Sequence, residues 1–169
     1  MLCPAREVPV DTKTDRPFDK ERVLPLLDQG FRQMVPHNAA LGLRAIDCDP
    51  GVCVLILPWA EHLVGNPDSG VLHGGPITTL LDACGGASVF LKLSKPVPIA
   101  TLDLRIDYLK MASPRRDVIA RCECYKLGRN VAFVRGVAYH DTPDDPIASC
   151  AATFMLSTKG KPVVSRGGK

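Results

Sequence analysis

The segment that most constrains the fold of this chain runs from residue 76 to residue 93. Its apolar side chains would surround nearly the whole circumference of a helix, and no helix breaker occurs before Gly85 and Gly86. A helix that is apolar on most sides is a buried helix. Pro76 suits the first position of such a helix. The small residues near its centre predict that another element packs closely against it.

The segments on either side of this helix have the pattern of β-strands. Two apolar-rich runs separated by a proline–glycine turn predict a hairpin over residues 41–48 and 52–58. Four more strands are expected over residues 97–109, 117–126, 130–140 and 147–157. From Leu102 to Tyr108 apolar and polar residues alternate, which predicts a strand with one buried face. We therefore expect an α+β fold in which an antiparallel sheet of about six strands wraps round one long central helix.

Length and composition favour one globular domain. With 169 residues, 46% of them hydrophobic and 23% charged, the chain can bury one sizeable core. Residues 1–17 are expected to form a flexible arm and residues 159–169 a polar tail. The domain between them, residues 18–158, begins with an amphipathic helix capped by Asp19. The apolar residues of this helix predict one buried stripe, made of Val23, Leu26, Leu27, Phe31 and Met34.

Charge and hydropathy exclude several classes of partner. The net charge of +3 comes from 21 basic and 18 acidic residues mixed along the chain, which gives no support to nucleic-acid binding. The longest apolar run, residues 52–60, is too short to span a bilayer as a helix. Residues 1–6 lack the apolar core of a signal peptide. We therefore expect a cytoplasmic protein with no membrane partner.

The cysteines give no indication of a metal site. There are seven, and no two have the C-x-x-C spacing of a zinc or redox pair. We interpret them as reduced thiols that are buried or half-buried. Cys48 and Cys53 flank the turn of the expected hairpin, and a disulfide between them is the alternative.

Residues 70–82 carry the chemistry. His73, Gly74 and Gly75 stand where a loop becomes the N-terminus of the central helix, and backbone N–H groups without helical partners can hold an oxyanion there. Asp82 lies farther along the same apolar helix. An unpaired buried carboxylate costs several kcal/mol. Asp82 is therefore paired with a base, solvated by a cleft, or functional.

The pattern G-x-L-H-G-G-x-x-x-x-L-L-D over residues 70–82 resembles the motif of the hot-dog-fold acyl-CoA thioesterases of the phenylacetyl-CoA and 4-hydroxybenzoyl-CoA type. The likeness extends over about residues 41–158 in the order of elements. It implies a hot-dog fold and an enzyme that hydrolyses an acyl- or aryl-CoA thioester to the free acid and CoA. It implies no cofactor, because the CoA is part of the substrate.

The resemblance also assigns catalytic roles. Asp82 matches the nucleophile or general base, and the N–H of Gly74 matches the donor to the thioester oxygen. His73 would orient the substrate or water, and the hydroxyl of Thr101, on the strand after the helix, would hold the attacking water. One branch of the family has an asparagine upstream of the histidine. Asn66 is the candidate for it, one residue farther from His73 than the family pattern places it.

Further residues are assigned to substrate binding. Gly75 adjoins the oxyanion donor, and Gly86 allows a close approach to the helix. Coenzyme A carries phosphates, so cations are expected near the mouth of the cleft. Lys126 and Arg129 resemble the family's turn before the penultimate strand, and Arg115 follows a proline turn. These cations are equally consistent with solvated hairpin tips.

The spacing of Gly74 and Asp82 predicts an oligomer. Eight residues along one helix correspond to about 12 Å, so one thioester cannot touch both groups of the same helix. The two groups would then come from two copies of the chain, in a homodimer or a dimer of dimers with active sites at the interface. Thr101 is expected to face Asp82 across that interface.

Two other functions are compatible with a hot-dog fold. One is an acyl-CoA hydratase or dehydratase, whose pattern resembles D-x-N-P-L-H. Here the Asn-Pro pair at residues 66–67 is followed by Asp68, and His73 comes several residues later, so that pattern is broken. The other is a non-catalytic acyl-CoA-binding domain. A pure binder needs no carboxylate in an apolar helix, so the presence of Asp82 together with Thr101 favours the thioesterase.

Overall fold

The computed structural model describes residues 18–156. The expected arm, residues 1–17, and the expected tail, residues 159–169, lie outside the described residues. The elements follow one another along the chain as α1 (Lys20–Gln33), α2 (Pro36–Ala40), β1 (Arg44–Asp49), β2 (Val52–Leu57), the 3-10 helix η1 (Glu61–Leu63), β3 (Val64–Asn66), β4 (Val71–Leu72), α3 (Gly74–Lys92), β5 (Ile99–Tyr108), β6 (Val118–Leu127), β7 (Val131–Tyr139) and β8 (Ala148–Leu156).

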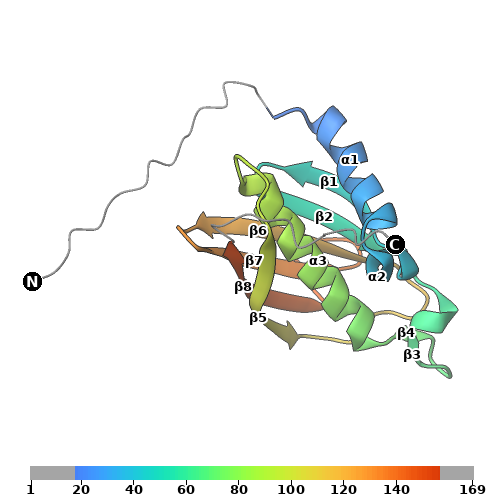
Figure 1. Ribbon diagram of the computed structural model, residues 1–169. Coiled ribbons are helices and arrows are strands. Elements are labelled where there is room, and N and C mark those ends of the chain that lie inside the picture. The colour runs from blue at the N-terminus through green and yellow to red at the C-terminus, as the bar shows by residue number, and fades with distance from the viewer. Residues whose placement is uncertain (1–17, 157–169) are drawn as a thin grey trace, which may run out of the picture.

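One antiparallel sheet supplies most of the backbone pairing. Its strands lie in the order β1-β2-β6-β7-β8-β5, and β3 and β4 form a separate two-stranded ribbon. The sheet curves around α3, with α1 beside β1 and β5 at the opposite edge (Figure 1). The predicted α+β arrangement, an antiparallel sheet of six strands around one long helix, is what the structure shows.

α3 is buried where it meets the sheet. Leu80, Leu81 and Cys84 have almost no exposed surface, which confirms the buried helix that the sequence predicts. A close approach occurs at Gly85, where a Cβ atom would stand only 3.2 Å from Cζ of Phe154 on β8. The glycine therefore lets the aromatic ring lie directly against the helix backbone, as the small residues at the centre of the segment predict.

A row of small side chains crosses the sheet beneath α3. Cys53, Cys122, Gly136 and Cys150 are paired in register on β2, β6, β7 and β8. The thiol of Cys84 on α3 donates a hydrogen bond to the carbonyl of Cys53 (3.2 Å). A side chain at Gly136 would collide with the thiol of Cys122, so the glycine makes room for sulfur. The cysteines of residues 18–156 are all free and buried, so the alternative disulfide across the β1–β2 turn is not formed.

α1 differs from its prediction. Oδ1 of Asp19 caps the helix by accepting a hydrogen bond from the N–H of Arg22 (3.1 Å), and Oδ1 of Asp28 accepts one from the N–H of Ala45 on β1 (3.0 Å). No residue of the helix is buried, however, and Met34 is 81% exposed. The expected buried stripe is therefore wrong in extent: Leu27 and Phe31 are half-buried against the edge of the core, whereas Leu26 is 60% exposed. The same apolar face also borders an open cavity.

The short elements before α3 go beyond the sequence prediction. α2 follows directly on α1, because Pro36 suits the first position of a new helix. β3 and β4 form around residues 65–70, which the sequence predicts to be a loop. Among the helices of residues 18–156, none is both long enough and apolar enough to cross a membrane.

Candidate active site

A histidine cap holds the start of α3. His73 is the N-cap residue, and its Nδ1 accepts a hydrogen bond from the N–H of Gly75 (2.9 Å). Because Nδ1 accepts, the ring proton lies on Nε2. α3 begins at Gly74, two residues before the predicted start. The cap is the reason, since it satisfies a backbone donor that the first turn would otherwise leave without a partner.

The cap leaves one N–H group of the first turn for a ligand. The N–H of Gly75 is occupied by His73, so Gly75, a predicted substrate-binding residue, has no amide to offer. Within residues 18–156, no acceptor is hydrogen-bonded to the N–H of Gly74. This donor stands at the N-terminus of a helix of 19 residues, where the helix dipole favours negative charge. Gly74 therefore has the geometry that an oxyanion donor needs.

Asp82 lies in the third turn of α3 and is half-buried. Its Oδ1 accepts a hydrogen bond from the hydroxyl of Thr101 on β5 (2.8 Å). Both residues belong to one chain, so the prediction that Thr101 faces Asp82 across an interface is wrong. No Lys, Arg or His of residues 18–156 forms an ion pair with Asp82. This carboxylate is therefore held by a hydroxyl and not neutralised by a base.

A β-bulge in β5 makes this contact possible. Thr101 pairs with Phe154 on β8, whereas the next pair along β8 is formed by Asp103, so Leu102 is the extra residue. The bulge places Thr101 on the same face of β5 as Leu104, the face that points to α3. Leu102 is 54% exposed, and the buried position predicted for it is wrong. The reason is that a bulge shifts the alternation of side chains by one residue.

Asp82 and Thr101 line an open cavity of about 450 Å³. Its other walls are mostly apolar and come from α1, from the second half of α3, from the start of β5 and from Phe154 on β8. Gly86, a predicted substrate-binding residue, belongs to this wall. So does Asn38, a buried polar residue on α2. The sequence carries no signal for Asn38, because the short helix that bears it is not predicted.

Gly74 opens into a different cavity. This second cavity has a volume of about 330 Å³ and lies between the start of α3 and the end of β5, with Tyr108, Lys110 and Met111 in its wall. The two cavities share no lining residue. Within one chain, Gly74 and the carboxylate of Asp82 therefore face separate spaces.

Tyr108 is a residue of this second cavity with no predicted role. Its O–H donates a hydrogen bond to the carbonyl of Gly74 (2.8 Å), and its Oη lies 3.1 Å from Oγ1 of Thr78. In the sequence Tyr108 looks like an ordinary strand residue. Only the folding of β5 alongside α3 brings it to the helix N-terminus.

The remaining predicted residues lie apart from Asp82. Oδ1 of Asn66 accepts a hydrogen bond from the N–H of Asp68 (3.0 Å), and Asn66 is exposed, so its side chain shapes the loop before β4. The side chain of Arg115 lies against Gly70, just before the motif, and its backbone is in the left-handed region with φ of 54°. Arg115 is therefore on the Gly74 side of the molecule.

Lys126 and Arg129 lie at the opposite end of the sheet. They belong to the end of β6 and to the turn that follows it. The N–H of Leu156 donates to the carbonyl of Asn130 in the same turn (2.7 Å), and Leu156 pairs with Ile99 at the start of β5. Within one chain the structure thus separates these two cations from Gly74.

α3 carries two chemical groups that hydrolysis of a thioester can use. A backbone N–H at a helix N-terminus can stabilise an oxyanion, and a carboxylate without a paired cation can activate water. Within residues 18–156, no three His, Cys, Asp or Glu side chains are grouped so that they could hold a metal ion. On a sheet wrapped round one helix, these groups define a hot-dog-fold thioester hydrolase.

Sequence comparison gives the family. The family described as the thioesterase superfamily matches residues 69–147. The medium/long-chain acyl-CoA thioesterase YigI of Salmonella typhimurium is 31% identical over 80% of this chain and 95% of its own length. A putative esterase of Halobacterium salinarum is 38% identical over 62% of this chain and 71% of its own length. The chain belongs to the thioesterase superfamily.

Solved structures agree with this assignment. The crystal structure of a protein from Pseudomonas aeruginosa has a TM-score of 0.72 at 41% identity, covering 80% of this chain and 99% of that chain. Thioesterase superfamily member 2 of zebra fish has a TM-score of 0.70 at 25% identity, covering 79% of this chain and 98% of that chain. Together the relatives confirm the predicted hot-dog fold and the predicted class of acyl-CoA thioesterase.

Proposed function

We propose that the protein is a dimeric acyl-CoA thioesterase whose preferred acyl group is a medium-length or long apolar chain. The observation that carries the proposal is the mostly apolar cavity that has the Asp82–Thr101 pair in its wall. Each CH₂ group moved from water into such a cavity contributes about 0.8 kcal/mol, so longer apolar chains gain more. The name of the relative YigI, a medium/long-chain acyl-CoA thioesterase, supports this substrate class.

α1 supplies the cavity wall that would contact the acyl chain. Leu27 and Phe31 on this helix pack against the edge of the core and line the cavity. Gly30 between them leaves open space, because the atom nearest to a Cβ placed there is Sδ of Met34, 4.0 Å away. A glycine inside a helix costs about 0.5–1 kcal/mol relative to alanine. Its presence at this wall supports a site that needs room for a chain.

In the proposed reaction Asp82 acts as general base. The hydroxyl of Thr101 donates a hydrogen bond to Asp82, so the hydroxyl oxygen can accept a hydrogen bond from a water molecule. Asp82 removes a proton from this water as the water oxygen bonds to the thioester carbonyl carbon. The resulting oxyanion accepts a hydrogen bond from the N–H of Gly74. The C–S bond then breaks, Asp82 returns the proton to the CoA sulfur, and the acid is released.

The proposed reaction uses only water and the acyl-CoA substrate and needs no cofactor. Nε2–H of His73 lies beside the oxyanion donor and is available to orient the thioester or water. An alternative role for Asp82, attack on the carbonyl as a nucleophile, is distinguished by a single turnover in oxygen-18 water. The general-base route puts the label into the acid product alone. Label in the peptide that contains Asp82 would instead show a covalent anhydride intermediate.

The dimer follows from the separation of the two cavities. β5 is an edge strand of 10 residues whose outer edge has no partner within the described chain. A long open edge tends to pair with another strand. Antiparallel pairing of two β5 strands about a two-fold axis at their middle would place Thr101 of one subunit opposite Ile106 of the other and Tyr108 opposite Ile99. The Thr101 end of each strand would then lie beside the Tyr108 end of the other. Since Thr101 binds Asp82 and Tyr108 binds Gly74, each carboxylate would approach the oxyanion donor of the other subunit.

The same dimer would unite the predicted phosphate contacts. Arg115 lies at the Gly74 end of the sheet, whereas Lys126 and Arg129 lie at the end where β5 begins. Two-fold antiparallel pairing would bring opposite ends of the two subunits together. The three cations would then share one side of each site, where CoA phosphates can bind them.

The cysteines support a location in a reducing compartment. Within residues 18–156 all of them are free and buried. We therefore extend the proposal to a cytoplasmic enzyme. Cell fractionation followed by an assay of thiol release from acyl-CoA would check this location.

A thiol-release assay over a series of saturated acyl-CoAs, from acetyl to palmitoyl, tests the proposed activity. We expect kcat/KM to rise with chain length until the cavity is filled. Tight binding without thiol release would contradict the proposal in favour of a binding domain. Addition of water to an enoyl-CoA without thiol release would contradict it in favour of a hydratase.

Complementation between two inactive variants tests the dimer. Asp82→Asn removes the base, and Gly74→Pro removes the oxyanion donor. If the site takes one group from each subunit, a heterodimer of the two variants has one intact site. Equal mixing after subunit exchange should restore about a quarter of the wild-type activity, because half of the dimers are then heterodimers. A mixture that stays as inactive as its components would show that both groups act within one chain.

A further inference from the structure

Tyr108 has no part in the proposed reaction, but its hydroxyl contacts the start of α3. Its O–H donates to the carbonyl of Gly74 (2.8 Å). Its Oη also lies 3.1 Å from Oγ1 of Thr78, one turn farther along α3. The contact is close: a Cβ atom added to Gly74 would stand 3.1 Å from the same Oη. The tyrosine hydroxyl therefore occupies the space that any side chain at residue 74 would need.

The peptide between Gly74 and Gly75 is hydrogen-bonded at both ends. Its carbonyl accepts from Tyr108 (2.8 Å), and its N–H donates to Nδ1 of His73 (2.9 Å). These two contacts fix how the peptide plane is turned about the helix axis. The adjacent peptide carries the N–H of Gly74, which has no partner in residues 18–156. Two hydrogen bonds on one peptide thus set the direction of the free donor next to it.

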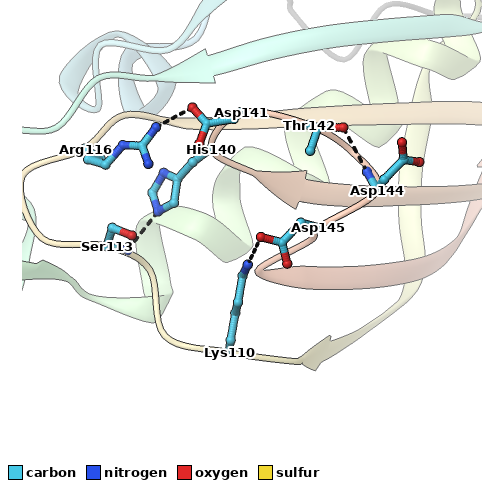
Figure 2. A network of polar contacts seen from close by, with 8 residues as sticks. All are labelled: Lys110, Ser113, Arg116, His140, Asp141, Thr142, Asp144 and Asp145. Atoms are coloured by element: carbon cyan, nitrogen blue, oxygen red, sulfur yellow. Dashed lines mark hydrogen bonds and ion pairs between the residues drawn. The ribbon is translucent and has the colours of Figure 1, made fainter.

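Tyr108 is itself attached to a well-braced part of the sheet. It pairs with Ala148 on β8, and the N–H groups of Leu109 and Lys110 both donate to the carbonyl of Ile147 (2.8 and 3.2 Å). Lys110 forms an ion pair with Asp145 (Figure 2). The end of β5 is therefore tied to the start of β8 directly after the tyrosine.

The loop that follows is braced as well. The N–H of Ser113 donates to Nε2 of His140 (2.8 Å), and Nδ1 of the same ring lies 2.7 Å from the carbonyl oxygen of Asp117. Figure 2 shows the contact between Ser113 and His140 next to the ion pair of Arg116 with Asp141. The hydrogen bond from Arg116 lowers the pKa of the Asp141 carboxyl below its usual value. Polar contacts thus join the β5–β6 loop to the β7–β8 turn.

We propose that Tyr108 is a positioning residue for the oxyanion donor: it acts on the thioester through the Gly74–Gly75 peptide and does not touch the reacting atoms. The proposal rests on the proposed thioesterase function. An oxyanion hole works because its donor is fixed before charge develops, at 2.7–3.1 Å from the oxygen. A purely structural role explains the tyrosine poorly, because Tyr108 is 50% exposed and contributes little to the core.

Tyr108→Phe tests the role of the hydroxyl. We expect kcat for the best acyl-CoA to fall about tenfold, a fraction of the hundredfold or greater loss seen when an oxyanion donor is removed. KM should stay within about twofold, since the donor acts mainly in the transition state. Tyr125→Phe is the matched control, because Tyr125 is 52% exposed and lies on β6, away from both cavities. A loss no larger than that of the control would overturn the proposal.

Combination with Gly74→Ala sharpens the test. The new Cβ keeps the N–H but presses on Oη of Tyr108, so this single variant should also lower kcat. Removing the hydroxyl in the double variant relieves the pressure. We therefore expect Tyr108→Phe to lower kcat in the wild-type background and to leave it unchanged or raise it in the Gly74→Ala background. An equal loss in both backgrounds would show that the tyrosine acts independently of Gly74 and would overturn the proposal.

Hydrogen exchange of the Gly75 amide gives a readout that does not depend on activity. If Tyr108 holds this peptide, the amide should exchange several-fold faster in Tyr108→Phe than in the wild type or in Tyr125→Phe. An unchanged rate would contradict the proposal even if the protein proved to have another activity. Absence of thiol release by the wild-type protein would contradict the proposed function alone.

Discussion

The first turn and the third turn of α3 carry the two halves of the proposed chemistry, and their surroundings are opposite in kind. The first turn is held by hydrogen bonds from two directions, through His73 and Tyr108, and one N–H is left over. In the third turn Asp82 has a single side-chain hydrogen bond within the described residues, from Thr101, and borders a mostly apolar cavity. The first turn thus fixes the direction of the free N–H of Gly74, whereas the third turn leaves open apolar space beside Asp82.

The difference teaches how one helix can serve a two-part reaction. An oxyanion donor must be immobile when charge develops, whereas an acyl chain needs open apolar space next to the attacking water. One place in a structure cannot easily meet both requirements. Here the two groups, the N–H of Gly74 and the carboxylate of Asp82, lie about 12 Å apart along the helix. Two copies of the helix that run in opposite directions would bring the two groups together, which is why we propose the dimer.

Removal of the Asp82 carboxylate should have the largest effect. Asp82→Asn keeps the shape of the side chain and an oxygen for the hydroxyl of Thr101, but it cannot accept a proton. Thiol release should fall by about 10²–10⁴-fold, the usual contribution of a general base. Asp103→Asn on the same strand as Thr101 is the control, and thermal melts should show both variants folded. Near-normal turnover of Asp82→Asn would show that Asp82 has a structural role and is not the general base.

A pair of variants at Gly74 should have the next largest effect. Gly74→Pro removes the N–H, and proline is tolerated at the first position of a helix. His73 already has the extended backbone that a residue before proline adopts (φ −65°, ψ 146°). Gly74→Ala adds a Cβ but keeps the donor. Proline should be about 10²–10³-fold slower than alanine. Equal rates for the two would mean that this N–H is not the oxyanion donor.

Substitutions of Thr101 distinguish the effect of its hydroxyl from the effect of its side-chain shape. Thr101→Val should lower kcat about tenfold or more, because a hydrogen bond to a charged group contributes about 1.5–3 kcal/mol. KM should change less than kcat. Thr101→Ser keeps the hydroxyl and should retain most activity. Equal kcat for Val and the wild type would remove Thr101 from the site and leave it as a strand residue chosen for its β-propensity.

A substitution of Gly30 tests the apolar cavity and should have the smallest effect of the four. Gly30→Leu would put a side chain into the cavity and displace the far end of a long acyl chain. kcat/KM should drop roughly fourfold for each methylene that is excluded, while the shortest acyl-CoAs are unaffected. Gln29→Leu, at an exposed position of the same helix, is the control. A uniform loss over all chain lengths would show that the acyl group lies elsewhere.

The positions of the main helices and strands could be predicted because they depend on local patterns. The apolar circumference of residues 76–93 indicates a buried helix, and the strands after it begin and end within about two residues of their predicted limits. The expected burial of the apolar stripe of α1 was wrong in extent for a related reason. An amphipathic pattern shows that one face avoids water, but it does not show whether the face meets a core or a cavity.

Part of the site is likewise a property of the sequence. His73, Gly74 and Asp82 lie on one continuous segment, so their placement at the start and in the third turn of one helix follows from the spacing of the motif. The proposal that two copies form each site rests on the same spacing. Asn66 shows the limit of this reasoning, because its side chain turns to the N–H of Asp68 and stabilises its own loop.

The tertiary structure alone decided which other side chains reach that helix. Alternation along β5 would put Thr101 and Leu104 on opposite faces, and only the bulge at Leu102, set by the pairing with β8, turns Thr101 towards Asp82. Tyr108 reaches Gly74 because the end of β5 runs past the start of α3. The physical reason is the same in both cases. A local pattern fixes the period of a strand, but its register is fixed by the strand beside it, and a shift of one residue changes the face on which every side chain lies.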